Sequence, residues 1–134
     1  MNDDELWDAF ADCSLPAGAF PHSVHVRIAW LHLRRHPLEE VVSLFPENLR
    51  RFTTAKGAPE RYHQTITWAF LLLVNERMHR NEVATWSAFA EGNRDLLDRG
   101  SSILKRYYRD DTLRSSLARD VFVLPDAAYE IRTP

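Results

Sequence analysis

Apolar residues in this chain recur at the spacing of a helix, and prolines stand where helices can begin. In the first segment, Leu6, Phe10 and Cys13 lie at positions i, i+4 and i+7 and therefore share one helix face. Asn2 or Asp3 can cap this helix. No segment of convincing length alternates apolar and polar residues as a half-buried strand does. The pattern predicts an all-α protein.

Prolines and glycines predict the limits of the next two helices. Pro21 begins a second helix that must end by His36, because Pro37 disfavours helical geometry in the residue before it. Pro37 begins a third helix. Pro46 is expected to divide this third helix before Lys-Gly at 56–57 stops it.

The clearest prediction is a long central helix over 59–80, about 22 residues and roughly 33 Å in length. Its middle, 66–74, is apolar almost all round, which in a soluble chain is typical of a helix surrounded by other helices. Shorter helices are predicted at 85–91, 102–109 and 111–119, and an extended tail at 121–134. Residues 1–134 are therefore expected to form a single compact helical bundle of six to seven helices around the central helix.

The composition fits one small domain. The 134 residues are 45% hydrophobic and include one cysteine, with 17 basic against 19 acidic side chains. Folding at this size buries roughly 68% of the surface, enough for one core without disulfides or metal. The lone Cys13 excludes a disulfide framework and a cysteine zinc site, and favours a reducing compartment, so a cytoplasmic location is expected.

The charge and the apolar runs narrow the classes of partner. The acidic N-terminal segment differs from a signal peptide, and the longest apolar run covers only 68–74, so no membrane partner is expected. A net charge of −2 gives no electrostatic footprint for nucleic acid. A small organic molecule is the expected partner, and a homo-oligomer stays open.

A stripe of histidines on the predicted second helix is the most informative pattern. On a helical wheel, His22, His25, His32 and His36 fall within an arc of about 80°. His22 and His25 lie one turn apart, a spacing that lets two imidazoles ligate one metal or clamp one substrate. His63, near the start of the central helix, is the natural third group. His32 and His36 lie toward the charged end and are expected at the solvated surface.

Aromatic and hydroxyl side chains flank these histidines in sequence. Trp30, Tyr62, Thr67 and Trp68 are candidate ligand-binding residues, with core packing as the alternative for Trp68. Thr67 lies one turn after His63 and is positioned to orient an imidazole or a ligand. Its alternative is a hydrogen bond to the preceding helical turn.

Four motifs of the chain resemble those of a family of small uncharacterised bacterial proteins. They are FPHSVHVRIAW at 20–30, YHQTIT at 62–67, LLDR at 96–99 and ARDVFVLPD at 118–126. The resemblance implies that His22, His25 and His63 are the family's histidines, and it implies no particular activity. It also draws attention to Arg119, which is either a surface cation near a helix end or an anchor for the tail that closes a pocket.

The apolar run 121–124 in the tail is expected to pack against the bundle, because an uncovered run of this kind favours aggregation. Phe122 is then expected to cover apolar surface on the central helix or a neighbour. Arg119 would hold the preceding turn, and Pro125 would fix the direction in which the tail leaves.

Three hypotheses of function follow. The first is a small-molecule enzyme in which His22, His25 and His63 form a partly buried catalytic cluster. These three imidazoles could ligate a divalent transition metal, Zn, Fe, Ni or Cu, or act without metal through a histidine general base. The second hypothesis is a non-catalytic accessory protein that binds a metal or ligand. The third is a protein-interaction module with structural histidines.

Overall fold

The computed structural model describes residues 1–98 and 102–127, and within these ranges the chain contains helices and turns but no strand. The all-α prediction is confirmed. The α-helices of the described ranges are α1 (Asp3–Ala11), α2 (His22–Arg35), α3 (Leu38–Ala55), α4 (Gln64–Arg80), α5 (Trp86–Gly92), α6 (Arg94–Leu97), α7 (Asp110–Leu113) and α8 (Ser116–Asp120). Single 3₁₀ turns are η1 (Ala17–Ala19), η2 (Pro59–Arg61) and η3 (Ile103–Arg106). None of these helices combines the length and apolar composition needed to cross a membrane.

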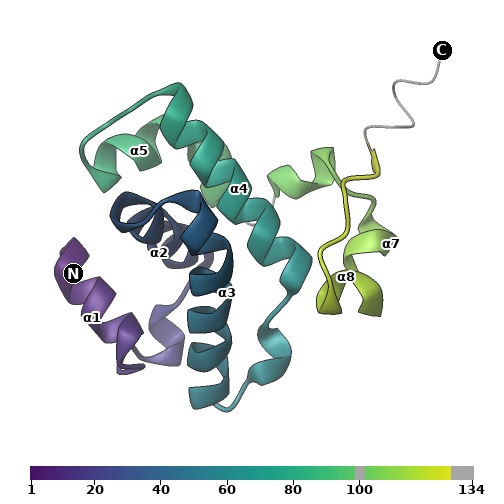
Figure 1. Ribbon diagram of the computed structural model, residues 1–134, viewed down its shortest axis with the longest axis horizontal. Coiled ribbons are helices and arrows are strands. Elements are labelled where there is room, and N and C mark those ends of the chain that lie inside the picture. The colour runs from purple at the N-terminus through teal and green to yellow at the C-terminus, as the bar shows by residue number, and fades with distance from the viewer. Residues whose placement is uncertain (99–101, 128–134) are drawn as a thin grey trace.

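Helix α4 occupies the middle of the molecule. Figure 1 shows it running between α1, α2 and α3 on one side and α7 and α8 on the other. It packs against α2, α3, α6 and α8, and Phe70, Leu71 and Val74 on it are buried. Neighbours on several sides explain why its sequence is apolar almost all round.

The central helix is shorter than its sequence predicts. The segment 59–80 begins with η2, continues through two extended residues, Tyr62 and His63, and becomes α-helical only at Gln64, for 17 residues. The break occurs because His63 is the N-cap of α4, and its Nδ1 accepts a hydrogen bond from the Ile66 amide at 3.1 Å. His63 therefore stands before the helix and not within it.

Pro46 does not divide its helix, contrary to prediction. Helix α3 runs through it without a break for 18 residues. Proline removes one backbone hydrogen bond inside a helix, but Phe45, Pro46 and Leu49 are all buried, so core packing maintains the continuous helix. The helix stops where predicted, before Gly57, whose φ of 73° favours glycine.

The short helices after α4 follow the predicted places only in part. The helix expected at 85–91 is present as α5, and the Thr85 side chain caps it. The segment 102–109 forms only the turn η3, and the segment 111–119 is interrupted at Ser115, which caps α8. Arg99, the last residue of the LLDR motif, and residues 128–134 of the predicted tail lie outside the described residues.

His32 is a core residue, and the expectation of a solvated position was wrong. Its side chain is 1% exposed and lies 4.6 Å from the Trp7 ring and 5.0 Å from the Phe45 ring. Its Nδ1 donates to the Ile28 carbonyl at 2.8 Å, so its Nε2 accepts from the Asn48 amide at 3.1 Å. Because both ring nitrogens are hydrogen-bonded, a neutral imidazole can be buried here. Burial lowers the pKa of His32 to about 4.

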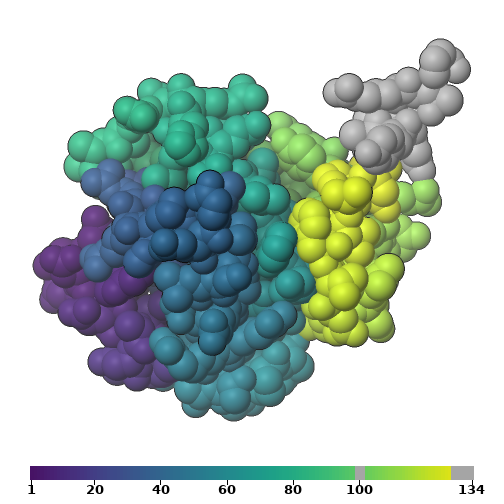
Figure 2. Space-filling model, in the orientation of Figure 1, coloured from purple at the N-terminus to yellow at the C-terminus, as the bar shows by residue number. Residues whose placement is uncertain are grey.

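The tail packs on α4 through the middle of its apolar run. Figure 2 shows α8 and the residues after it lying against α4. The Phe122 ring lies 5.5 Å from the Trp68 ring, which confirms that Phe122 covers the central helix. Val121 and Leu124 are 47% and 68% exposed, so the expectation that the whole run is covered was wrong. Phe122 and Val123 in the middle of the run are half-buried, whereas the residues at its two ends are exposed.

Thr65 attaches this tail to α4. Its buried hydroxyl donates to the Val121 carbonyl at 2.9 Å and accepts from the Val123 amide at 3.1 Å. The Tyr108 hydroxyl donates to the Val123 carbonyl at 2.7 Å. A hydroxyl inside an apolar helix therefore has its partners on the tail.

Acidification is expected to destabilise the protein through His32. Its pKa is about 4 in the folded state against 6.5 for an unperturbed histidine, so the unfolded state takes up its proton first. The stabilisation is complete above about pH 6.5 and is lost as the pH falls toward 4. This difference between the pKa values of the folded and unfolded states corresponds to a contribution of about 3 kcal/mol to the free energy of unfolding.

Urea unfolding at pH 7 and pH 5 measures this effect. His32→Gln should lose less stability between the two pH values than the unmodified protein. His36→Gln, at the residue that follows α2, is the control, because the His36 side chain is 37% exposed and pairs with Glu40. An unchanged loss of stability in His32→Gln would contradict the assignment.

Releasing the tail is expected to destabilise the bundle. Thr65→Val leaves the Val121 carbonyl and the Val123 amide without their side-chain partner, so the free energy of unfolding should fall by about 1–2 kcal/mol. Thr54→Val is the control and should be neutral, because Thr54 is an exposed residue of α3.

Truncation after Asp120 should expose the Trp68 ring and lower the melting temperature or produce oligomers. Thermal melts and sedimentation read out both changes. A truncated protein that behaves like the full chain would make the tail dispensable.

Candidate functional site

A cavity of about 560 Å³ is lined by all three candidate histidines. It lies between the start of α2, the second half of α3, the turn that leads into α4, the start of α4, η3 and α7. The volume is in the range of small-molecule sites. Its apolar walls are made by Phe20, Leu49, Phe52, Ile66, Phe70 and Leu104.

His22 links the start of α2 to the end of α6. Its Nε2 lies 2.9 Å from the Leu96 carbonyl oxygen, which can only accept, so the Nε2 hydrogen is donated there. The Phe70 ring meets the imidazole edge-on at 4.7 Å. His22 thus joins residues 74 positions apart in the sequence.

His63 uses both ring nitrogens in the structure. Its Nδ1 caps α4 through the Ile66 amide, so the hydrogen sits on Nε2, which donates to the Leu113 carbonyl at 2.7 Å. The ring is 8% exposed. One imidazole therefore fixes the start of the central helix and holds α7 beside it.

The three imidazoles do not form the metal site that the sequence suggested. Both nitrogens of His63 are committed to backbone groups, and the Nε2 of His22 is committed to the Leu96 carbonyl. Within 1–98 and 102–127, no group of three or more His, Cys, Asp or Glu side chains is arranged to hold a metal ion. The proposed ligand set of His22, His25 and His63 is corrected accordingly, because sequence spacing predicted proximity and not the direction of each lone pair.

His25 differs from the other two. Its Nε2 is shielded from solvent and has no hydrogen-bonding partner among the described residues. The rings of Phe20 and Phe45 lie 5.8 and 5.7 Å from the imidazole, and the His22 ring lies 6.3 Å away. Burial, with a smaller contribution from His22, lowers the pKa of His25 to about 4, so the side chain is neutral at pH 7. A buried polar atom without a partner costs about 1–3 kcal/mol, which a hydrogen-bonding ligand would recover.

Two of the four predicted ligand-binding residues line the cavity, namely Tyr62 and Thr67. The Tyr62 hydroxyl donates to the Gln64 side chain at 2.5 Å, and the Arg50 guanidinium lies over the ring at 4.5 Å. Burial raises the pKa of Tyr62. The phenol is therefore neutral at physiological pH and already held in place by neighbouring side chains.

Trp30 and Trp68 do not line this cavity, which corrects their predicted role. Trp30 packs against Trp86, and Trp68 lies under the tail. Trp30 follows His25 by five positions within α2, and five residues of helix turn a side chain by about 140°. A neighbour in sequence at this spacing faces away from the histidine.

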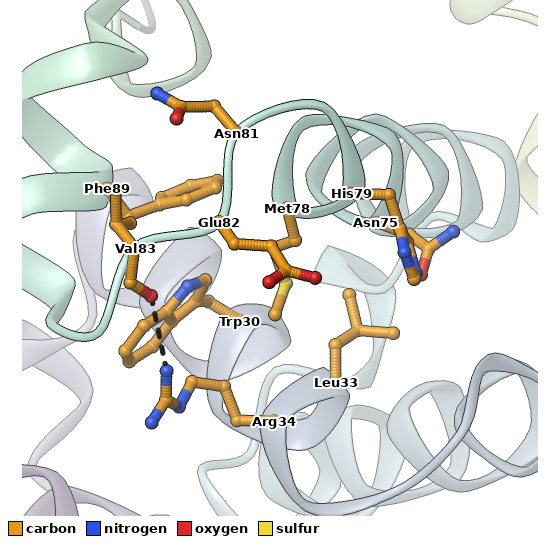
Figure 3. Close-up of a pocket in the computed structure, with 10 residues that line it drawn as sticks. All are labelled: Trp30, Leu33, Arg34, Asn75, Met78, His79, Asn81, Glu82, Val83 and Phe89. Carbon is orange, nitrogen blue, oxygen red and sulfur yellow. Dashed lines mark hydrogen bonds between the residues drawn. The ribbon is translucent and has the colours of Figure 1, made fainter.

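Trp30 lines a second, smaller cavity of about 270 Å³, drawn in Figure 3. The Arg34 guanidinium lies 4.8 Å from the Trp30 ring centre and donates to the Val83 carbonyl at 3.4 Å. Met78 and Glu82 lie on the facing side. Sequence analysis did not predict this cavity, because the loop after α4 folds back over α2 to form it.

Arg119 anchors the turn that carries Tyr62 and His63. Its guanidinium donates to the Glu60 carbonyl and, at 3.2 Å, to the Tyr62 carbonyl. Because α8 is thereby fastened to the turn before α4, the contact agrees with the anchor suggested by the sequence. The hydrogen bonds of Arg119 and His63 together hold the C-terminal wall of the cavity.

Sequence reasoning missed three basic residues of the cavity, Lys56, Arg61 and Lys105. They come from the C-cap of α3, from η2 and from η3, and no periodic pattern connects them. Basic side chains are mostly exposed in any protein, so only the fold shows that these three share a cavity.

Comparison with known proteins adds no assignment. No family model, characterised protein or solved structure matches this chain. The family resemblance drawn from the four motifs stays a prediction, and function is inferred from the cavity itself.

Replacing His63 is expected to destabilise the protein more than replacing His25. His63→Leu removes the cap of α4 and the bond to Leu113, with an expected loss of about 2–3 kcal/mol. His63→Asn keeps a capping side chain but does not reach Leu113, with a loss of about 1 kcal/mol. His25→Leu removes an unpaired buried nitrogen and should be close to neutral.

Urea unfolding at pH 7 ranks these variants. A loss for His25→Leu as large as for His63→Leu would show that the His25 imidazole has a structural hydrogen bond and is not reserved for a ligand.

Proposed function

We propose that this protein binds a small organic molecule in the cavity between α2, α3, α4 and η3, with His25 as a neutral hydrogen-bonding contact. The observation that carries the proposal is the buried Nε2 of His25, which has no partner among the described residues and belongs to a side chain that lines the cavity. Native proteins pair nearly all buried polar atoms, so an unpaired one on a side chain that lines a ligand-sized cavity favours a binding contact.

The walls support the same proposal. Small-molecule sites are mostly apolar, with few polar groups that fix orientation. Here aromatic and aliphatic side chains surround His25, while Tyr62 and Thr67 supply further polar atoms. No metal enters the proposal, since the described side chains offer no ligand set for one.

The two other histidines give the cavity its shape. The bond of His22 to Leu96 and that of His63 to Leu113 fasten the C-terminal helices, whose residues Leu104 and Leu113 form one wall. The hypothesis of structural histidines thus fits His22 and His63, and the ligand hypothesis is kept for His25.

Catalysis at His25 is the second candidate function. The observation that favours it is the neutral state of this imidazole at pH 7, in which it can accept a proton from a bound substrate. A general base works best when its pKa is near the working pH, and a pKa of about 4 makes His25 a weak base. Binding without chemistry is therefore the function that the geometry favours.

Blocking the cavity tests the proposal. N-phenyl-1-naphthylamine, a neutral aromatic probe that fluoresces in apolar surroundings, should bind the unmodified protein saturably. Ile66→Trp places an indole in the cavity and should weaken binding at least about tenfold, because the probe and the indole compete for the same space. The readout is probe fluorescence excited beyond the absorption of tryptophan.

Leu72→Trp on the same helix is the matched control, because Leu72 is 37% exposed and lies outside the cavity. If Ile66→Trp does not fold, Thr53→Trp serves the same purpose, because Thr53 lines the cavity from α3. Absence of saturable binding, or equal binding to the blocked variants, would refute the proposed site.

A further inference from the structure

The cavity carries an excess of positive charge that its apolar walls do not require. Lys56, Arg61 and Lys105 line it, and none of the three forms an ion pair within the described part of the chain. The remaining charged lining residue, Asp110, is paired with Arg114. The excess is local, because the whole chain has a net charge of −2.

The charge of Lys56 is not taken up by the nearby carboxylate of Asp12. The pKa of Asp12 is lowered mainly by hydrogen bonds from Ser14. The charge of Lys56 makes the smallest contribution to this shift, so the two side chains interact only weakly. The Lys56 ammonium lies 5.5 Å from the centre of the Phe52 ring, at the border between charge and apolar wall.

The charge and the apolar surface are arranged as two parts of one site. Arg61 and Lys105 are exposed and Lys56 is half-buried, which places the cations at the opening. Phe52 and Phe70, in the walls, are 3% and 5% exposed. A ligand that matches this arrangement has an apolar body and one negatively charged end.

Resting on the proposed function above, we propose that the ligand of this cavity is an amphipathic organic acid. Its ring or chain would lie against the Phe52 and Phe70 walls, and its carboxylate, sulfonate or phosphate would meet Lys56, Arg61 and Lys105. An anion gains from these unpaired cations at the edge of an apolar cavity, whereas a cationic ligand of the same shape is repelled by them.

A pair of matched probes tests the charge preference. 8-Anilino-1-naphthalenesulfonate has the ring system of N-phenyl-1-naphthylamine with one added sulfonate. At low salt, the sulfonate probe should bind about tenfold more tightly than the neutral probe. This difference in affinity should shrink at high ionic strength, because salt screens exposed charges. Both probes should lose binding in Ile66→Trp.

Charge-removing variants locate the effect. Lys56→Gln and Lys105→Gln should each weaken binding of the sulfonate probe roughly two- to five-fold, and the double variant about tenfold, in each case more than they weaken binding of the neutral probe. Arg106→Gln is the matched control, because Arg106 is the exposed neighbour of Lys105 and does not line the cavity. Its binding of the sulfonate probe should equal that of the unmodified protein.

The outcomes separate the two proposals. Cavity binding of the neutral probe with no advantage for the sulfonate, or with no effect of the lysine variants, would overturn the acid ligand and leave the binding function standing. Sulfonate binding that survives Ile66→Trp would place the anion elsewhere and also overturn it. Failure of both probes to bind the unmodified protein would refute the binding function itself.

Discussion

The imidazole of His63 joins the start of the central helix to α7, and the candidate site depends on that connection. One ring nitrogen caps the central helix and the other holds Leu113 of α7. Without the cap, the chain from η2 could continue as one helix, and the extended residues that lead into α4 would not form. Without the second bond, α7 would lose its hydrogen bond to the residue that caps α4, and the core packing of Leu104, the Arg119 contacts and the tail would remain to hold this wall.

Local sequence signals were sufficient for most of the fold. The capping box at Asn2, the proline before α2 and the Thr85 cap each act within one helical turn, so a single sequence reveals them. Errors arose where distant contacts outweighed local preference. Packing keeps α3 helical through Pro46, and a pocket of aromatic rings from α1 and α3 buries His32.

The sequence predicted where the candidate histidines lie, but it did not predict the role of each one. One helical turn between His22 and His25 was enough to place both at one cavity. The partners of His22 and His63, however, lie 74 and 50 residues away along the chain, so no spacing rule could show that their nitrogens were already bonded. The basic residues of the opening come from three separate elements and needed the folded structure.

The contrast between His25 and His32 shows why one imidazole is a candidate for binding and the other is structural. Both lie on α2, two turns apart, and burial lowers the pKa of each to about 4. The Phe45 ring of α3 lies within 6 Å of both imidazoles, yet the Asn48 side chain of the same helix reaches only the Nε2 of His32. Apolar rings around His25 would be expected to favour an apolar residue there. A histidine kept at that point with an unpaired nitrogen gives up stability locally, as functional sites commonly do. The binding function proposed above would account for this residue, since a molecule bound in the cavity would supply the missing hydrogen bond.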